Sequence, residues 1–155
     1  MTSYSQLDSR EIDTLRRWTV ERWDRQSGIV QKIQEASPQN RLWRQEATRL
    51  LIQAGLAPKR VRTWWNIQAP DFSDGPYPDI YPHKHAIEPG ATVILYLYPG
   101  DVPAPLEVLT DDCDIEETIV PEKGLSVVIP NGVYHQVHKN RGTRDRIALI
   151  AEGYP

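Results

Sequence analysis

The chain has 155 residues, enough for one domain with a substantial core and too few for two independent domains. Its residues are 39% apolar and 25% charged, and its net charge of −3 excludes the overall cationic field that nucleic acid would recognise. Cys113 is the only cysteine, which excludes an internal disulfide and favours a reducing compartment such as the cytoplasm. The longest apolar run, residues 91–98, is far shorter than the roughly 20 residues that a membrane helix needs. We therefore expect neither a membrane nor nucleic acid as a partner.

The N-terminal part of the chain opens with a helical pattern. Asp8 followed three residues later by Glu11 is a capping pattern, and the apolar residues after it lie at mostly helical spacing, namely Ile12, Leu15, Trp18 and Trp23. We expect Gly28 to interrupt this helix before residues 29–33 resume its apolar face. Pro38 should end the segment, because the residue before a proline avoids the helical conformation.

A second amphipathic helix is predicted over residues 40–54. Gly55 is well placed as its C-terminal stop, and its apolar side chains form one stripe, namely Trp43, Ala47, Leu50, Leu51 and Ala54. This stripe needs a partner to cover it. We expect that partner to be a β-sheet formed by the rest of the chain.

The pattern changes after Pro58 to short β-branched and aromatic runs separated by turn residues. The strand candidates are residues 61–68, 92–98, 106–109, 126–129 and 146–151, with 117–120 and 133–138 as shorter ones. No long helix intervenes, so an antiparallel arrangement is favoured over a parallel one, which needs crossover helices. The chain is thus predicted to be one domain, with a helical segment (1–57) packed on a β core (58–155).

All four histidines lie in two short clusters, about fifty residues apart. His83 and His85 are two positions apart and would point to the same side of a strand. His135 follows the turn at residues 130–132 and could supply a third imidazole, which would complete one face of a metal site. His138 does not share the facing of His135 and is expected at the surface. The alternative is that these histidines belong to a solvated polar strand edge.

Residues 63–154 resemble the double-stranded β-helix metalloenzymes, in particular the iron(II), 2-oxoglutarate-dependent oxygenases. The resemblance rests on four local motifs, namely Trp-Trp-Asn at 64–66, His-Lys-His at 83–85, the strand at 92–97 and the Pro-Glu-Lys-Gly turn at 121–124. It also rests on the ten residues that separate His135 from the basic residue Arg146. It implies a mostly β fold, a jelly-roll or cupin-like barrel with two or three helices packed on it.

The same resemblance implies roles for individual residues. His83, His85 and His135 would bind iron(II) at the catalytic centre, and Arg146 would pair with the far carboxylate of 2-oxoglutarate. A planar guanidinium suits that task because it binds a carboxylate through two parallel hydrogen bonds. Tyr96 aligns with a position whose hydroxyl helps to bind the same carboxylate. The alternatives are an outward-facing arginine and a tyrosine that only fills the core.

Two residues depart from the usual family pattern. His85 stands where most members have an aspartate or glutamate, so the metal would be one charge more positive than with a carboxylate ligand. Glu88 or a water molecule is an alternative third ligand. Ala148 stands where a serine or threonine usually supplies a hydrogen bond to 2-oxoglutarate.

The sequence therefore predicts an oxidoreductase that uses iron(II) and 2-oxoglutarate to hydroxylate a small molecule. Two alternatives are open. The spacing from Gly124 to His135 also follows a cupin motif, which fits a three-histidine dioxygenase or isomerase that does not use 2-oxoglutarate. The third hypothesis is a metal-free barrel that acts as a binding module. Residues 71–81 are a candidate substrate lid, and the abundance of tryptophan permits a homodimer interface. The candidate pocket residues are aromatic, namely Trp64, Trp65, Tyr77 and Tyr81.

Overall fold

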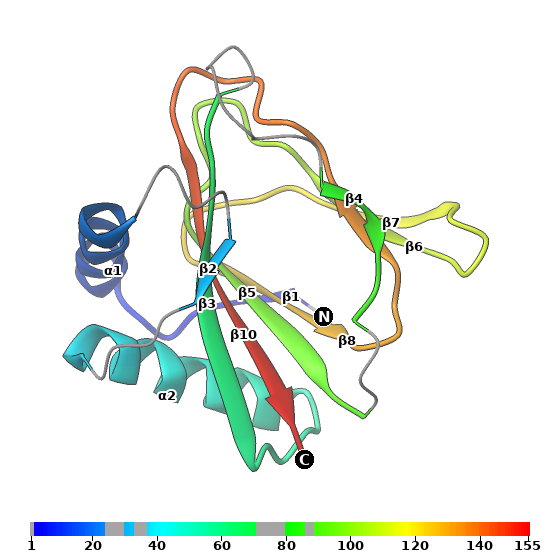
Figure 1. The fold of residues 1–155 in the computed structure, drawn as a ribbon, viewed down its shortest axis with the longest axis horizontal. Coiled ribbons are helices and arrows are strands. Elements are labelled where there is room, and N and C mark those ends of the chain that lie inside the picture. Colours follow the sequence, from blue (N-terminus) through cyan, green and yellow to red (C-terminus); the bar gives the residue numbers. More distant parts are fainter. Residues whose placement is uncertain (1, 24–29, 33–36, 71–79, 86–88) are drawn as a thin grey trace.

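Two antiparallel sheets face each other in the computed structural model, and both helices cover the outer side of the larger sheet (Figure 1). The structure describes residues 2–23, 30–32, 37–70, 80–85 and 89–155. Its elements are β1 (Thr2–Tyr4), α1 (Ser9–Arg22), β2 (Val30–Lys32), α2 (Pro38–Gln53), β3 (Arg60–Gln68), β4 (Ile80–His83), β5 (Ala91–Tyr98), β6 (Leu106–Leu109), β7 (Ile115–Ile119), β8 (Leu125–Pro130), β9 (His135–Val137) and β10 (Arg146–Tyr154). The larger sheet has the order β1-β8-β5-β10-β3-β2 and the smaller one β4-β9-β6-β7. This mostly β, antiparallel arrangement confirms the predicted fold class.

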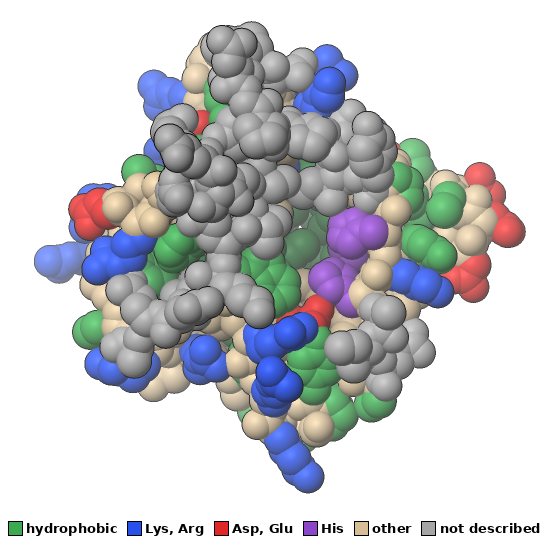
Figure 2. Space-filling view, in the orientation of Figure 1, with side chains coloured by type: hydrophobic (Ala, Val, Ile, Leu, Met, Phe, Trp, Pro, Cys, Tyr) green, Lys and Arg blue, Asp and Glu red, His purple; other side chains and the backbone are tan. Residues whose placement is uncertain are grey.

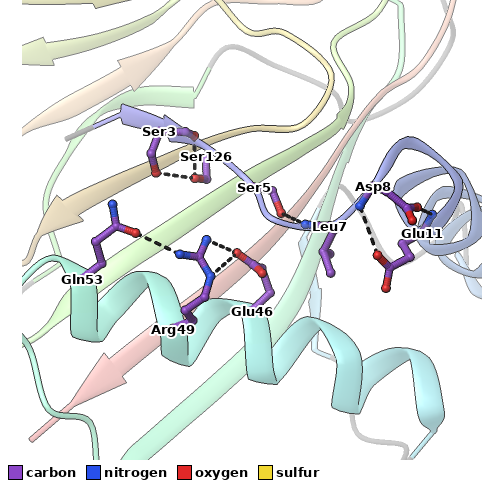
Figure 3. Close-up of polar contacts among 9 residues, drawn as sticks. All are labelled: Ser3, Ser5, Leu7, Asp8, Glu11, Glu46, Arg49, Gln53 and Ser126. Atoms are coloured by element: carbon purple, nitrogen blue, oxygen red, sulfur yellow. Dashed lines mark hydrogen bonds and ion pairs between the residues drawn. The ribbon is translucent and has the colours of Figure 1, made fainter.

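The first helix begins at the predicted cap. The carboxylate of Asp8 accepts a hydrogen bond from the backbone N–H of Glu11 at 2.8 Å, and the Glu11 carboxylate accepts one from the Asp8 N–H at 3.1 Å (Figure 3). This reciprocal pair satisfies two of the N–H groups that a helix start leaves free. Before this helix in the chain, the Ser126 hydroxyl of β8 donates a hydrogen bond to the Ser3 carbonyl of β1 at 2.8 Å. This bond adds to the pairing of β1 with β8 at the edge of the larger sheet.

The predicted resumption of helix α1 is wrong. Residues 30–32 form strand β2, which pairs antiparallel with β3 so that Val30 lies opposite Asn66. Ile29 and Ile33 lie outside the described residues. The edge of β3 offers a row of backbone N–H and C=O groups, and a short extended segment satisfies them. This partner lies more than thirty residues away in the sequence, so local periodicity does not reveal it.

All the strands predicted after Pro58 are present with shifted ends, whereas β1, β2 and β4 were not among the predicted strands. β6 has the predicted bounds, and β5 starts one residue earlier than expected. β7 starts at Ile115, two residues earlier than expected, and β10 runs to Tyr154, three residues beyond the predicted end at Ala151. The longer β10 matters for function, because it brings Glu152 into the sheet.

The larger sheet is buried on both faces, which explains why β5 is buried over almost its whole length. On the outer face, the helices pack side chains such as Leu15, Trp43 and Leu51 against the sheet. On the inner face, Ile94, Tyr96, Ala148 and Ile150 belong to a second core that fills the space between the sheets together with side chains from the facing strands. Every second residue of β5 and β10 therefore points into the barrel.

No helix within the described ranges is long and apolar enough to span a bilayer.

The contact between α2 and β10 is tight enough to test. Leu51 is fully buried, and its Cδ1 lies only 2.5 Å from where a side-chain carbon at Gly153 would be. We expect Leu51→Ala to lower the free energy of unfolding by about 2–5 kcal/mol. The neighbouring Ile52 is 59% exposed, so Ile52→Ala should change the free energy of unfolding by less than about 0.5 kcal/mol. Urea unfolding measures both, and equal losses would contradict this packing.

Candidate metal centre and carboxylate site

Three histidines from two separate segments converge inside the barrel. His83 of β4 lies directly opposite His135 of β9, with ring centroids 4.2 Å apart. The ring of His85 lies parallel to that of His135 at 5.5 Å. One ring nitrogen from each of the three residues lies within 4.8 Å of the others. Figure 2 shows histidine side chains at the open face of the barrel, with hydrophobic side chains behind them.

The strand period does not by itself place His85. Strand β4 ends at His83, so the expected alternation along one strand stops before the third position of the triplet. Instead, the backbone N–H of Gly132 donates a hydrogen bond to the His85 carbonyl at 2.9 Å. Gly132 has a φ of +92°, a conformation that favours glycine. The turn that precedes His135 therefore also fixes His85, and this contact between two loops was absent from the sequence prediction.

The environment of His135 suits a neutral ligand. Its side chain is almost completely buried, and its Nδ1 lies 3.1 Å from the Val133 carbonyl. Burial lowers the pKa of His135 to about 4, with a further contribution from the neighbouring His83. The imidazole is thus uncharged at neutral pH. With a proton on Nδ1, shared with the carbonyl, Nε2 is the nitrogen that can bind a metal.

A carboxylate that the sequence analysis missed contacts this cluster. Glu152 of β10 is 3% exposed, and its Oε2 lies 2.6 Å from Nδ1 of His85. Its Oε1 lies 2.7 Å from Nη2 of Arg62. The sequence signal existed, because Glu152 continues the two-residue period of Arg146, but the predicted strand ended one residue before it.

The histidines line a cavity of about 260 Å³ with mostly apolar walls. The remaining lining residues come from five strands, namely Trp64, Asn66, Thr92, Ile94, Leu106, Val137 and Ile150. Trp64 lines the cavity as predicted, and Tyr81 belongs to β4. The prediction for Trp65 is wrong, because its side chain packs edge-on against Trp18 in the core under the helices. Tyr77 lies outside the described residues. Residues 71–79 of the predicted lid and Glu88, the alternative ligand, lie outside the described residues. A second hollow, of about 840 Å³, lies near Gly55 and Pro130, and none of the described residues that line it has an ionisable side chain.

Arg146 points into the barrel, and the outward-facing alternative is wrong. The residue is 6% exposed, and its Nη2 donates a hydrogen bond to Oε1 of Gln68, which lies opposite it on β3. Its Nη1 is buried and has no partner among the described residues. Burial lowers the pKa of Arg146 to about 10, so the guanidinium is still charged at neutral pH. A buried cation with a free donor is an anion-binding group.

Tyr96 faces the same interior from β5. It is 4% exposed, and burial raises its pKa to about 12, an effect that the positive charge of Arg146 partly offsets. The phenol therefore keeps its proton at neutral pH and can donate a hydrogen bond. Both predicted carboxylate-binding residues are thus buried, oriented inward and in the protonated form that binds an anion.

A tightly bonded loop places Arg146 at the start of β10. The buried side chain of Asn140 donates to the carbonyls of Gln68 and Arg144, at 2.9 and 2.6 Å. Asp101 accepts hydrogen bonds from the Thr143 N–H at 2.8 Å and from its hydroxyl at 2.6 Å. These bonds, with that of the hydroxyl foremost, lower the pKa of Asp101 to about 2. Two side chains thus fix the path of the chain just before the arginine.

His138 lies at the surface, as predicted. About half of its side chain is exposed, and its Nε2 is bonded to Glu107. Gln136 donates to the same carboxylate at 3.1 Å. Glu107 pairs with Gln136 in the smaller sheet, one position away from the pair of Val108 with His135. This alternation places the two groups on opposite faces, so His138 is separate from the other three histidines.

Solved structures of several enzymes share this fold. A prolyl-4-hydroxylase of Pseudomonas putida is 19% identical, with a TM-score of 0.69 covering 100% of this chain and 92% of that chain. SnoN, a non-heme alpha-ketoglutarate-dependent epimerase from nogalamycin biosynthesis, is 15% identical, with a TM-score of 0.73 covering 98% and 76%. HygX from Streptomyces hygroscopicus, solved with nickel and 2-oxoglutarate bound, is 14% identical, with a TM-score of 0.71 covering 99% and 81%.

No protein-family model and no curated protein sequence matches the chain. At these identities the structural likeness shows the fold, and it confirms the double-stranded β-helix that the sequence predicted. The activity must be argued from the side chains of this chain.

The histidine cluster makes a direct prediction about metal binding. Replacing His83 or His135 by alanine removes one of three imidazoles, so we expect Co(II) and Ni(II) affinity to fall by at least about tenfold. Isothermal titration calorimetry of the purified apoprotein measures this. His138→Ala, which removes the histidine on the other face, should leave the affinity unchanged. Equal affinities for all three variants and the natural protein would contradict a metal centre at this place.

Proposed function

We propose that the protein is a non-haem iron(II), 2-oxoglutarate-dependent oxygenase. The observation that carries this proposal is the buried Arg146, whose Nη1 has no partner among the described residues, in the same barrel as three clustered imidazoles. This guanidinium is bonded to a neutral amide, and the described part of the chain gives it no ion pair. A bound carboxylate would supply both the missing hydrogen-bond acceptor and the missing charge.

The histidine cluster fits iron(II) by its donor chemistry. Imidazole is a suitable ligand for iron, and His83, His85 and His135 would each supply one nitrogen. The hydrogen bonds from the second nitrogen of His85 and of His135 fix which nitrogen faces the ion. When bound, iron(II) supplies the redox chemistry that couples decarboxylation of 2-oxoglutarate by dioxygen to oxidation of a substrate C–H bond.

The protein's own residues would bind and orient the co-substrate. Arg146 would hold its distal carboxylate through two parallel N–H bonds, one from the free Nη1, and Tyr96 would donate a third bond from its hydroxyl. Ile94 and Ala148 belong to the same inner core as Tyr96, and their side chains are apolar. Apolar walls exclude water and strengthen the electrostatic contacts inside.

A small molecule is the proposed substrate, and hydroxylation the proposed outcome. The cavity at the histidines is about 260 Å³ with mainly apolar walls, which suits a small substrate group rather than a large polar ligand. The proximity of Trp64 and Thr92 offers one aromatic face and one hydroxyl for orientation. Residues 71–81 are proposed to act as a substrate lid, and the cytoplasm is the proposed location.

A three-histidine dioxygenase or isomerase is the second candidate function. It is favoured by the donor set, which has imidazole alone and no carboxylate in the cluster. Such an enzyme would chelate its substrate directly and would have no use for a buried arginine with a free donor. Arg146 therefore separates the two candidates, and a protein without metal affinity would leave only the binding module.

Binding of 2-oxoglutarate tests the proposal. Mixed anaerobically with iron(II) and 2-oxoglutarate, the protein should develop the visible absorption band of the chelated keto acid. We expect Arg146→Gln to weaken 2-oxoglutarate binding by at least about tenfold, because a charge-assisted hydrogen bond contributes roughly 1.5–3 kcal/mol, while metal affinity stays unchanged. Arg144→Gln changes an exposed arginine two residues earlier and serves as the matched control. Absence of the band in the natural protein would contradict the proposal.

Tyr96→Phe gives an independent measurement on the same carboxylate. Loss of the buried hydroxyl removes one neutral hydrogen bond, so we expect a smaller loss of 2-oxoglutarate affinity than for Arg146→Gln, on the order of threefold to tenfold. The phenylalanine variant should fold, because the ring still fills the inner core. Titration of the absorption band with 2-oxoglutarate reports this change, and unchanged affinity would assign Tyr96 to the core alone.

A further inference from the structure

Glu152 is a buried carboxylate in the row of β10 that faces the barrel interior. It follows Arg146, Ala148 and Ile150 at intervals of two and is 3% exposed. A carboxylate loses several kcal/mol of hydration when it is buried, and the surrounding groups must compensate for it. Stability alone would favour an apolar residue at this position, so the contacts of Glu152 indicate a role.

The two oxygens of Glu152 contact two different partners. Oε2 lies 2.6 Å from Nδ1 of His85, and Oε1 lies 2.7 Å from Nη2 of Arg62. The same Nη2 lies 2.8 Å from the hydroxyl of Tyr154, and the guanidinium carbon lies 5.4 Å from the centre of that ring. Arg62 is directly opposite Glu152 in the sheet. A continuous chain of contacts thus runs from Tyr154 through the arginine and the glutamate to His85.

We propose that Glu152 is a positioning residue that orients His85 as a metal ligand and supplies the negative charge that an all-imidazole cluster lacks. This inference rests on the proposed metal centre. A carboxylate that accepts the Nδ1 proton selects one tautomer, so Nε2 of His85 faces the ion. It also makes that nitrogen a stronger donor. The carboxylate is thus bonded to the ligand His85 and does not bind the metal itself.

The geometry separates this role from that of a direct ligand. Both oxygens of Glu152 are engaged, one by the imidazole and one by the guanidinium. Among the described residues, the side chains whose ligand atoms lie close enough together to bind one ion are the three histidines, and Glu152 is not one of them. Arg62 and Tyr154 keep the carboxylate in place from the other side. The effect of Glu152 on the metal should therefore depend on the presence of His85.

Glu152→Gln tests the charge while keeping the shape of the side chain. We expect the dissociation constant for Co(II), measured by calorimetry on the apoprotein, to rise about tenfold to a hundredfold. Glu46→Gln is the matched control, because Glu46 is also buried and is bonded to Arg49 (Figure 3). It belongs to α2, which packs on the outer side of the larger sheet and contributes no residue to the histidine cluster. Its Co(II) affinity should equal that of the natural protein. Equal affinity for both variants would overturn the inference.

A double-mutant cycle identifies the path of the effect. If Glu152 acts through His85, then adding Glu152→Gln to a His85→Ala protein should change Co(II) affinity less than twofold. The visible spectrum of bound Co(II) should also differ between Glu152→Gln and the natural protein, because the orientation of one imidazole changes. Additive losses, or a Glu152→Gln variant that binds no Co(II) while His85→Ala binds it tightly, would show a direct ligand and overturn the proposal.

A second variant keeps the test available if Glu152→Gln does not fold. Arg62 is 37% exposed at its side chain, so Arg62→Gln is tolerated more easily and leaves the carboxylate less firmly held. Its Co(II) affinity should fall in the same direction, by less than in Glu152→Gln, and an unchanged affinity would overturn the inference. These measurements need no 2-oxoglutarate. The inference about Glu152 can therefore be refuted even if the absorption band supports the proposed function. Loss of Co(II) binding in the natural protein would instead refute the metal centre.

Discussion

The register of β10 between β3 and β5 determines both ends of the candidate site. Arg146 lies opposite Gln68, and Glu152 lies opposite Arg62, in one continuous pairing over nine residues. Because alternate residues face the interior, the guanidinium at one end and the carboxylate at the other point to the same side of the sheet. A shift by one residue would turn both toward the helices. The packing of α2 and the inner core on opposite faces excludes that shift.

Charge is distributed unevenly along this strand. At one end, the positive Arg146 is bonded to the neutral amide of Gln68 and to no carboxylate among the described residues, and burial lowers its pKa without removing its charge. At the other, the negative Glu152 is held between Arg62 and an imidazole. Arg146 can therefore still bind an anion, whereas both oxygens of Glu152 already have partners. This difference explains why we assign co-substrate binding to Arg146 and support of the metal ligands to Glu152.

Local patterns predicted much of this architecture. The capping pair at Asp8 and Glu11, the stripe of α2 and the β-branched strands appear within windows of a few residues, and the structure contains each of them. The prediction of helix over residues 30–32 was wrong, because an edge strand far away in the sequence offers hydrogen bonds that no local period contains. Likewise, His85 reached the cluster through the Gly132 hydrogen bond, because β4 ends before it.

The sequence by itself determined the class of fold and the chemical types at the site, because periodicity follows from burial and because imidazole and guanidinium have few uses in a barrel interior. It also suggested that His83, His85 and His135 lie together. Only the tertiary structure decided which side of β10 the arginine occupies, that its Nη1 has no partner among the described residues, and that Glu152 meets His85. These facts depend on contacts between residues tens of positions apart, and such contacts are set by sheet register, which a single strand does not contain.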